Sequence, residues 1–328
     1  MRRTLTGPLL PVVAMLVLFG LLVPGAAAQR APAAASASGA GLTSEQAVAV
    51  ATSSMEVGAN DFRLSDMGQD NTYDAFSPAV AYNSTDNEYL VVWYGDDDDA
   101  GTVVDGEYEI YGQRVDAATG VEIGPEMRLS DMGPDGDPAY DAYNPAVAYN
   151  STNDEYLVVW ASDDNAGELV NDEFEIFGQR VEAATGAEIG INDFRISDMG
   201  PDGNADYVAA YAAVAYNSAD NEYLVVWAGS NDLAGMDPDE AEIYGQRLDA
   251  ATGAEVGVND FLISSMGAVG DANYLALHPA VAHNPEDNEY LVVWSGDDNT
   301  APLVDNELEV FANCCDPTEV RRDLMTFA

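Results

Sequence analysis

The sequence repeats itself every 67 residues, and this period constrains the fold more than any other feature. The period is visible in four tryptophans that each end the same apolar run, Tyr-Leu-Val-Val-Trp: Trp93, Trp160, Trp227 and Trp294. Repeats of this length indicate a solenoid, a propeller or an array of small units. Such a chain buries its apolar side chains between neighbouring units, because a single unit cannot cover its own apolar face.

Each repeat reads as four short strands. In the first repeat the predicted strands are residues 78–82, 88–93, 109–116 and 127–130. These segments are rich in β-branched and aromatic residues and are separated by turns rich in Asn, Asp and Gly. A four-stranded antiparallel meander that repeats around an axis is a β-propeller blade. The sequence therefore predicts an all-β protein, a propeller of four blades of about 67 residues each.

The order of the strands suggests how the ring closes. Residues 60–65 match the fourth strand of a repeat, whereas the last repeat has three recognisable strands, at 279–283, 289–294 and 307–311. We expect the N-terminal strand to complete the last blade, so that no sheet edge is exposed. An open stack and a truncated piece of a larger propeller are the alternatives. The predicted propeller covers residues 59–312, with repeats at about 59–125, 126–191, 192–258 and 259–312.

The first residues are typical of an export signal. Arg2 and Arg3 precede an apolar run at 9–23, and small residues follow up to Ala28, after which we place the cleavage site. The run of about 15 residues is short for a bilayer span, which takes about 20. No other segment is apolar enough to cross a membrane. The sequence predicts an exported protein, extracellular or on the cell surface with the periplasm as the alternative, and an Ala/Ser-rich linker at 29–58.

The charge of the chain is extreme. It has 58 Asp and Glu against 11 Lys and Arg, a net charge of −47, and every one of its fixed positive charges is an arginine. Such a surface repels nucleic acids and anionic lipid head groups, which bind basic patches. It is compatible with divalent-cation binding, adaptation to high salt, or solubility through self-repulsion. Cys314 and Cys315 are adjacent, so the chain is not built around a disulfide framework.

Two loops of each repeat concentrate carboxylates, and calcium, which takes six to eight oxygen ligands, is the cofactor that such loops predict. The strongest candidate set is Asp131, Asp135, Asp137 and Asp141. The corresponding positions of the first and third repeats carry Asp66, Asp70, Asp74, Asp198, Asp202 and Asp206. Neither loop matches the complete EF-hand pattern. The alternative is a solvated acidic loop whose Asp and Asn side chains cap turns.

The repeated tryptophans and arginines favour structural roles. Arginines recur after Gly-Gln and on the fourth strand of the repeats, where they could clamp a carboxylate ligand or form ion pairs within a blade. Ion pairs are favoured, because every repeat is rich in Asp and Glu. His278 and His283 are the two histidines, and His283 replaces a tyrosine on the strand that would line the channel. No Ser, Cys or Thr stands beside a histidine as an activated nucleophile would, so no catalytic residue is predicted.

Three motifs carry a resemblance to known repeats: Pro-Ala-Val-Ala-Tyr-Asn, Asn-Glu-Tyr-Leu-Val-Val-Trp and Ile-Tyr-Gly-Gln-Arg-Val. They resemble the repeats of functionally uncharacterised secreted or surface proteins of environmental bacteria, over residues 60–311. The resemblance implies a propeller-like β fold and brings no catalytic residues with it. The Asp-box of sialidase-like propellers is absent. The fourth repeat departs from its pattern at residues 310–315, and residues 313–328 are predicted to be an atypical tail, as in a truncated or frame-shifted reading frame.

Uniform repeats, high acidity and the lack of a catalytic constellation together predict a function. We expect a secreted, monomeric, non-enzymatic propeller that binds a protein or a glycan, or serves as a structural module, and is stabilised by calcium. The alternative is a glycan-binding or glycan-processing propeller, similar to sialidases, that acts through its central channel. The sequence leaves the identity of the ligand open.

Overall fold

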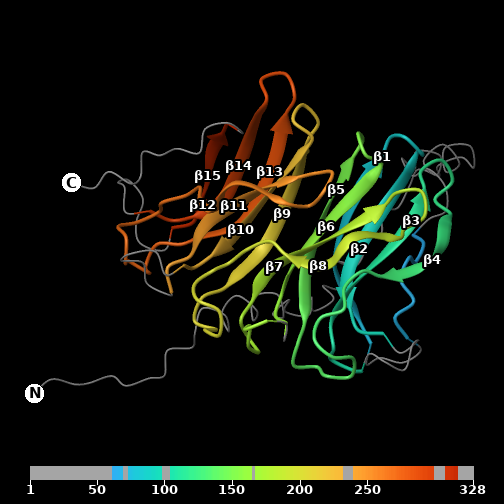
Figure 1. The fold of residues 1–328 in the computed structure, drawn as a ribbon, viewed down its shortest axis with the longest axis horizontal. Helices are drawn as coiled ribbons and strands as arrows, with labels where there is room; N and C mark the ends of the chain where they lie inside the picture. Colours follow the sequence, from blue (N-terminus) through green and yellow to red (C-terminus); the bar gives the residue numbers. More distant parts are fainter. Residues whose placement is uncertain are drawn as a thin grey trace, which may run out of the picture.

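The computed structural model describes residues 61–68, 73–97, 104–164, 167–231, 239–298 and 307–316. These residues form fifteen strands in four antiparallel sheets (Figure 1), and they contain no helix that could span a bilayer. The predicted signal peptide and linker lie outside the described residues. The predictions of an all-β chain and of four propeller-blade sheets are confirmed.

Within each sheet, every strand pairs with the strand that follows it in the sequence. The first sheet consists of β1 (Ala75–Asn83), β2 (Glu88–Gly95), β3 (Glu109–Asp116) and β4 (Glu122–Arg128). The second consists of β5 (Ala142–Asn150), β6 (Glu155–Ser162), β7 (Glu175–Glu182) and β8 (Glu188–Arg195). The third consists of β9 (Ala209–Asn217), β10 (Glu222–Gly229), β11 (Glu242–Asp249) and β12 (Glu255–Leu262). The fourth consists of β13 (Ala276–Asn284), β14 (Glu289–Gly296) and β15 (Glu309–Cys315).

An asparagine fixes the turn between the first two strands of each sheet. The side-chain oxygen of Asn83 accepts hydrogen bonds from the backbone N–H groups of Thr85, at 2.7 Å, and Asp86, at 3.1 Å. Asn87 then takes a left-handed φ of 56°, which asparagine tolerates better than most residues. Asn150 forms the same turn in the second sheet. The turn sets the register of the hairpin, and through it decides which side chains face each neighbouring sheet.

The Gly-Gln pair of the third strand is explained by its neighbours. A Cβ on Gly178 would lie 2.8 Å from Cδ1 of Ile196, so only glycine lets the segment after β8 approach this closely. The buried amide of Gln179 donates to the carbonyl of Arg180 at 2.9 Å and accepts from the backbone N–H of Asp193 at 3.0 Å. The pair therefore ties the outer strand to the sheet where the β7–β8 register is irregular.

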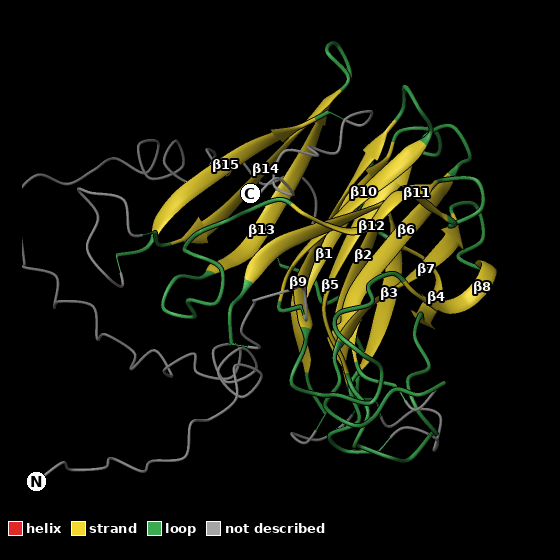
Figure 2. Ribbon diagram, turned by 60° about the vertical axis from the view of Figure 1, so that its left-hand side comes forward, coloured by secondary structure: helices red, strands yellow, loops and turns green. Residues whose placement is uncertain are grey.

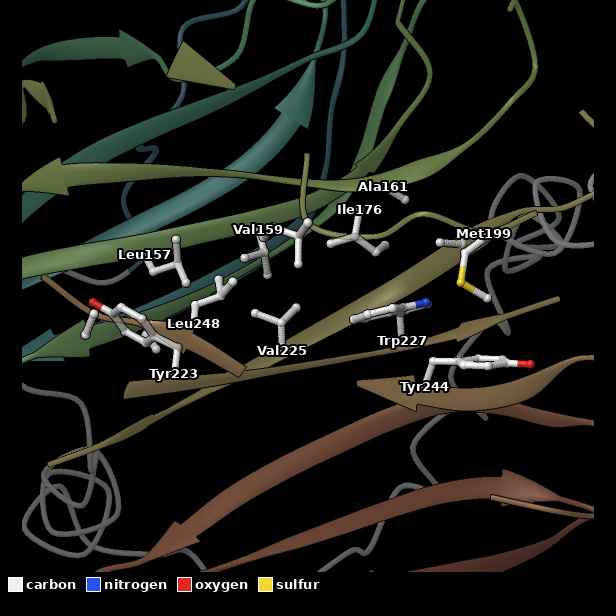
Figure 3. Close-up of a cluster of buried hydrophobic side chains, with 14 residues drawn as sticks. Leu157, Val159, Ala161, Ile176, Met199, Tyr223, Val225, Trp227, Tyr244 and Leu248 are labelled. Atoms are coloured by element: carbon white, nitrogen blue, oxygen red, sulfur yellow. The ribbon is translucent and has the colours of Figure 1, made fainter. Parts of the chain in front are cut away.

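The apolar core lies between the sheets. Figure 3 shows Leu157 and Val159 of the second sheet facing Tyr223, Val225 and Trp227 of the third, and all five side chains are fully buried. The same combination recurs between the first and second sheets and between the third and fourth. A strand covered on both faces needs a continuous apolar run, which is what Tyr-Leu-Val-Val-Trp provides. All four repeated tryptophans are buried, so the prediction that they serve in packing is confirmed.

The four sheets follow one another in sequence order, with the first strand of each sheet on the inside. β1 packs on β5, β5 on β9, and β9 on β13, whereas each fourth strand contacts chiefly the third strand of its own sheet. Figure 1 shows the order of the sheets along the chain. Figure 2 shows the sheet of β13, β14 and β15 turned away from the other three. This arrangement brings the inner strands of all four repeats to a common axis.

The predicted closure of the ring by the N-terminal strand is wrong. Residues 61–68 form no strand, and they lie against the first sheet, where Nε1 of Trp93 donates to Sδ of Met67 at 3.2 Å. Met266 contacts Trp294 in the same way at 3.2 Å, so this segment takes the place that the end of a preceding repeat takes in later sheets. The last sheet has three strands among the described residues. Residues 61–68 pack on Trp93 and do not pair with β15, because contact with Trp93 closes a much shorter loop and so costs less conformational entropy.

The last strand runs past the predicted end of the propeller at residue 312. β15 ends at Cys315, so the first three residues of the predicted tail belong to the sheet. Cys314 is exposed and Cys315 is partly buried. Residues 317–328 lie outside the described part of the chain.

Candidate functional site

Each inner strand contains a β-bulge opposite the repeated tryptophan. In the first sheet the pairing skips two residues of β1, Ser77 and Pro78, which lie opposite the single residue Trp93. The same two-residue bulge occurs in the other sheets at Asn144-Pro145, Tyr211-Ala212 and His278-Pro279. Two residues opposite one is the definition of a bulge, and proline is tolerated there because no ladder hydrogen bond needs its missing N–H.

The first residue of each bulge has a strained backbone. The φ angles are 47° for Ser77, 52° for Asn144, 57° for Tyr211 and 53° for His278, in the left-handed region. This conformation costs a non-glycine residue roughly 1–2 kcal/mol, and it is least suited to bulky side chains. The backbone is therefore the same in all four repeats, while the side chain is different in each. Strain of this kind concentrates at functional positions.

The four bulges line one pocket. Its volume is about 390 Å³, and its walls are formed by two residues from each sheet: Ser77, Pro78, Asn144, Pro145, Tyr211, Ala212, His278 and Pro279. The volume falls in the range of about 300–1,000 Å³ that small-molecule sites occupy. None of the lining residues carries a fixed charge, although the chain has a net charge of −47.

The pocket presents neutral hydrogen-bonding groups. The rings of Tyr211 and His278 are in contact, with centroids 4.3 Å apart and planes tilted by 49°. Burial lowers the pKa of His278 and raises the pKa of Tyr211, because a low-dielectric environment disfavours both charged forms. At neutral pH the imidazole therefore offers one donor and one acceptor, next to a phenol, an amide and a hydroxyl.

An aromatic cluster flanks the pocket on the side of the first two repeats. Its members are Phe76, Tyr94, Tyr108, Tyr143 and Phe174, which the third and fourth repeats replace by smaller or aliphatic residues. The centroids of Phe76 and Tyr94 are 5.3 Å apart, and those of Tyr94 and Tyr143 are 5.2 Å apart. Phe76 and Tyr143 immediately precede the bulge residues of their strands. The cluster thus places ring surface beside the pocket in one half of the molecule only.

The predicted calcium ligands are brought together, but around an arginine. Arg128 contacts Asp131 at 2.9 Å and Asp135 at 2.7 Å, and its third partner is the buried carboxylate of Glu109 at 2.5 Å. Arg195 holds Asp198 at 2.8 Å and Asp202 at 2.6 Å in the same way, and Arg63 pairs with Asp66 at 2.9 Å. A guanidinium between the carboxylates takes the place that a cation would occupy.

The remaining candidate ligands are engaged in loop hydrogen bonds or lie apart. Asp141 accepts from the backbone N–H of Tyr108 at 3.0 Å and from the hydroxyl of Tyr143 at 2.7 Å. Asp137 accepts from the backbone of Ala139 at 3.3 Å. The backbone N–H groups of Asp74 and Asp206 donate hydrogen bonds to the side chains of Asp96 and Asn204, and Asp70 lies outside the described residues. Across the described ranges no three His, Cys, Asp or Glu side chains form a group suited to a metal ion. Calcium binding stays a prediction.

Buried carboxylates brace the acidic loops. Asp163 is almost completely buried, and its two oxygens accept from the backbone N–H groups of Asp141, at 2.9 Å, and Asp172, at 2.8 Å. Burial raises the pKa of Asp163 to about 6. Glu107 and Glu173 accept from loop glycines in the same manner. Many of the acidic side chains therefore satisfy backbone donors that no strand partner reaches.

The arginines of the third strand form ion pairs within their sheets, as predicted. Arg180 binds Glu155 through two hydrogen bonds, of 3.1 Å and 2.7 Å, and both side chains are buried. The first and third sheets repeat the pair as Arg114 with Glu88 and Arg247 with Glu222. No arginine lines the pocket, so the pocket holds no clamp for an anionic ligand.

The sequence analysis singled out His283, whereas the structure places His278 in the pocket. Nε2 of His283 lies 3.1 Å from Oδ1 of Asn288, and it replaces the hydroxyl that Tyr216 donates to Asn221 at 2.9 Å in the previous repeat. His283 is therefore a turn residue, whereas His278 lies in the pocket. One signal could have found the site: the position before the Pro or Ala of the first strand carries four different residues, whereas the Ala-Val-Ala that follows is the same in every repeat.

No protein-family model and no curated protein matches the chain in sequence. Solved structures with a similar arrangement are an N-acetylgalactosamine deacetylase from F. plautii (11% identity, 75% of this chain and 73% of that chain, TM-score 0.44), an arabinanase from Bacillus subtilis (13%, 69% and 67%, 0.39) and an α-L-arabinofuranosidase from Fusarium graminearum (13%, 74% and 62%, 0.46). At these identities and scores the likeness concerns the fold alone.

The comparisons correct the expected function. The uniform repeats predict a non-enzymatic binding or structural module, whereas the structurally similar proteins are carbohydrate-processing enzymes. The main prediction of a non-enzymatic module is wrong in this respect, and its alternative, a propeller that handles glycans, becomes a proposal for this chain. Whether this chain has such chemistry depends on its own residues.

Proposed function

We propose that this protein recognises neutral carbohydrate in the pocket formed by the four bulges. One observation carries the proposal: four equivalent positions keep the same strained backbone but carry Ser77, Asn144, Tyr211 and His278 around a single pocket. A structural position would keep its residue from repeat to repeat, as the tryptophans do. Side chains that vary on a constant backbone around one pocket support a binding site that is built on a constant scaffold.

The chemistry of the pocket matches a sugar. Hydroxyl, amide, phenol and neutral imidazole groups donate and accept hydrogen bonds, as the hydroxyls of a sugar do. The rings of Tyr211 and His278, together with the aromatic cluster, offer apolar surface for the C–H face of a sugar ring. Prolines complete the wall without adding charge. The site therefore combines a mostly apolar lining with a few convergent polar groups.

Electrostatics select the class of sugar. The net charge of −47 repels anions, and the arginines of the third strands are already paired with glutamates inside the sheets. Uronic and sialic acids would enter a negative field without a counter-charge in the pocket. Neutral glycans carry no such cost, so the proposal departs from a sialidase-like activity.

Hydrolysis of the bound glycan is a second candidate function. Glycoside hydrolysis uses two carboxyl groups, one of which has a raised pKa and acts as the acid. Asp74 and Asp141 stand three residues before Ser77 and Asn144, and the third and fourth repeats have Val208 and Leu275 at this position. Burial raises the pKa of Asp141, in the direction that a proton donor requires.

We take this protein to work outside the cytoplasm, where its N-terminal signal pattern would send it.

A glycan array followed by calorimetry on the best ligand tests the binding site. Tyr211→Ala and His278→Ala are each expected to weaken binding about tenfold, because an unsatisfied polar group costs about 1–3 kcal/mol. The matched control is His283→Tyr, which changes the other histidine to the residue that the earlier repeats carry and should leave affinity unchanged. An array without neutral ligands, or equal losses in the control, would refute the proposal.

A panel of neutral oligosaccharide substrates separates binding from hydrolysis. If the chain hydrolyses its ligand, Asp141→Asn is expected to abolish turnover, because the amide cannot donate the proton, while calorimetric affinity is retained. Release of no sugar from any substrate that binds would leave recognition and remove the hydrolytic candidate.

A further inference from the structure

The sheets of this protein contact one another through two different faces. We call the leucine face the side that carries the Leu of the second strand and the Ile of the third, such as Leu224 and Ile243. The tyrosine face is the opposite side, which carries the Tyr and Trp of the second strand, such as Tyr290 and Trp294. The leucine face of each of the first three sheets packs on the tyrosine face of the next sheet. One interface is thus used three times.

Among the described residues, no sheet packs on the leucine face of the last sheet. The leucines of the first three sheets are at most 1% exposed, whereas Leu291 is 46% exposed. The contrast is larger on the third strand, where the isoleucines of the first three sheets are 0% exposed and Val310 is 75% exposed. Ala282 and Ala312 beside them are also exposed. The centre of this face is apolar.

The tyrosine face of the first sheet is the opposite half of the same interface. The tyrosines of the other three sheets are at most 1% exposed, whereas Tyr89 is 38% exposed. Val80 is 60% and Tyr82 is 47% exposed on the neighbouring strand, although Trp93 is covered by residues 61–68. The chain therefore displays both halves of an interface that it already forms internally three times.

We propose that the protein associates with a second copy of itself, head to tail, through these two faces. The leucine face of the fourth sheet in one copy packs on the tyrosine face of the first sheet in the other, and so repeats the internal interface. Large exposed apolar surfaces on soluble proteins mark interaction sites, and here the complementary surface is carried by the same chain. Because the two faces differ, the contact is heterologous, and it forms closed rings or open chains of copies.

The match between the two kinds of face favours a head-to-tail contact between copies over a contact between two identical faces. Two leucine faces, or two tyrosine faces, have no precedent among the three internal contacts. The opposed halves that pack inside the molecule are a Leu-Val-Ile surface and a Tyr-Val-Trp surface, with shapes already matched to each other. Closure of the fourth sheet onto the first within one chain would use the same residues but leave the protein monomeric. The molecular mass in solution therefore distinguishes closure within one chain from association of two copies.

Light scattering coupled to size exclusion, over a series of protein concentrations, measures the association. We expect a mass of at least two chains that falls towards one chain on dilution. Leu291→Asp and Tyr89→Asp are each expected to abolish it, because each places a carboxylate at the centre of one face. The matched control is Ile191→Asp on β8, since Ile191 is 74% exposed, like Val310, but lies on an outer strand of an internal sheet.

Mixing the two variants tests the direction of the contact. The Leu291→Asp variant keeps an intact tyrosine face, and the Tyr89→Asp variant keeps an intact leucine face, so the mixture is expected to form a heterodimer although neither variant associates alone. A monomer at every concentration would overturn the proposal. So would association that survives both substitutions, loss of association in the Ile191→Asp control, or a mixture that stays monomeric.

Discussion

Glu242 offers a direct test of how buried carboxylates affect stability. It is 1% exposed, Oε1 accepts from the backbone N–H of Met266 at 2.6 Å, and Oε2 accepts from the hydroxyl of Ser264. The corresponding glutamates of the first two repeats pair with Arg128 and Arg195, but the third repeat has Leu262 instead. Burial raises the pKa of Glu242 from 4.5 to about 7.

The sign and size of the pH dependence follow from this pKa. The folded state binds the proton of Glu242 more tightly than the unfolded state does. The stabilisation that this protonated carboxyl gives to the folded state is therefore fully present below about pH 4.5 and is lost as the pH rises to about 7. Each unit of pKa shift corresponds to about 1.4 kcal/mol, so the carboxylate costs the folded state about 3 kcal/mol at pH 8. Glu242→Gln removes the charge and keeps an oxygen that accepts from Met266.

Urea unfolding at pH 4 and pH 8 measures the effect. The free energy of unfolding of Glu242→Gln, relative to the natural chain, is expected to rise by about 3 kcal/mol between pH 4 and pH 8. Glu122→Gln, at an exposed carboxyl of β4, is the control and should show no such difference. A Glu242→Gln variant whose relative stability is the same at both pH values would refute the reasoning.

Two further predictions concern the ion pairs. Arg180→Ala leaves the buried Glu155 unpaired and should lower the free energy of unfolding by about 3–5 kcal/mol, whereas Arg63→Ala, in a pair exposed on both sides, should change it by less than about 1 kcal/mol, as urea unfolding would show. If calcium binds the acidic loops as the sequence predicts, calcium at matched ionic strength raises the melting temperature and a chelator reverses the rise, because the ion takes Asp131 and Asp135 from Arg128. A melting temperature that calcium leaves unchanged would refute calcium binding.

The packing of the sheets was predictable from the repeats, because an apolar run on both faces of a strand must be covered on both. Trp160 and Trp227 are buried for this reason. The bulges were not predictable, since a bulge is a relation between two strands. Pro78 reads as the start of a strand in sequence, but β1 begins at Ala75 and the proline lies in the bulge.

The acidic loops show a second limit of sequence. Aspartates at Asp131 and Asp135 have a spacing that suits a metal site and suits an arginine fork equally well. Side-chain direction decides between the two, and Arg128 is placed between them by β4. The N-terminal segment shows a third limit: its similarity to a fourth strand was real, but Met67, just beyond the strand-like part, determines where it packs.

The bulges have a consequence for how this protein can change. Because one backbone accommodates serine, asparagine, tyrosine and histidine, the bulge is set by the paired residues around it and not by the side chain it displays. The backbone at the four positions therefore accepts side chains of different size and chemistry. Under the proposed function, substitutions there would change which ligand the pocket binds and would leave the scaffold intact. A duplicated repeat gains a new contact residue at once, and selection can diversify the pocket one repeat at a time.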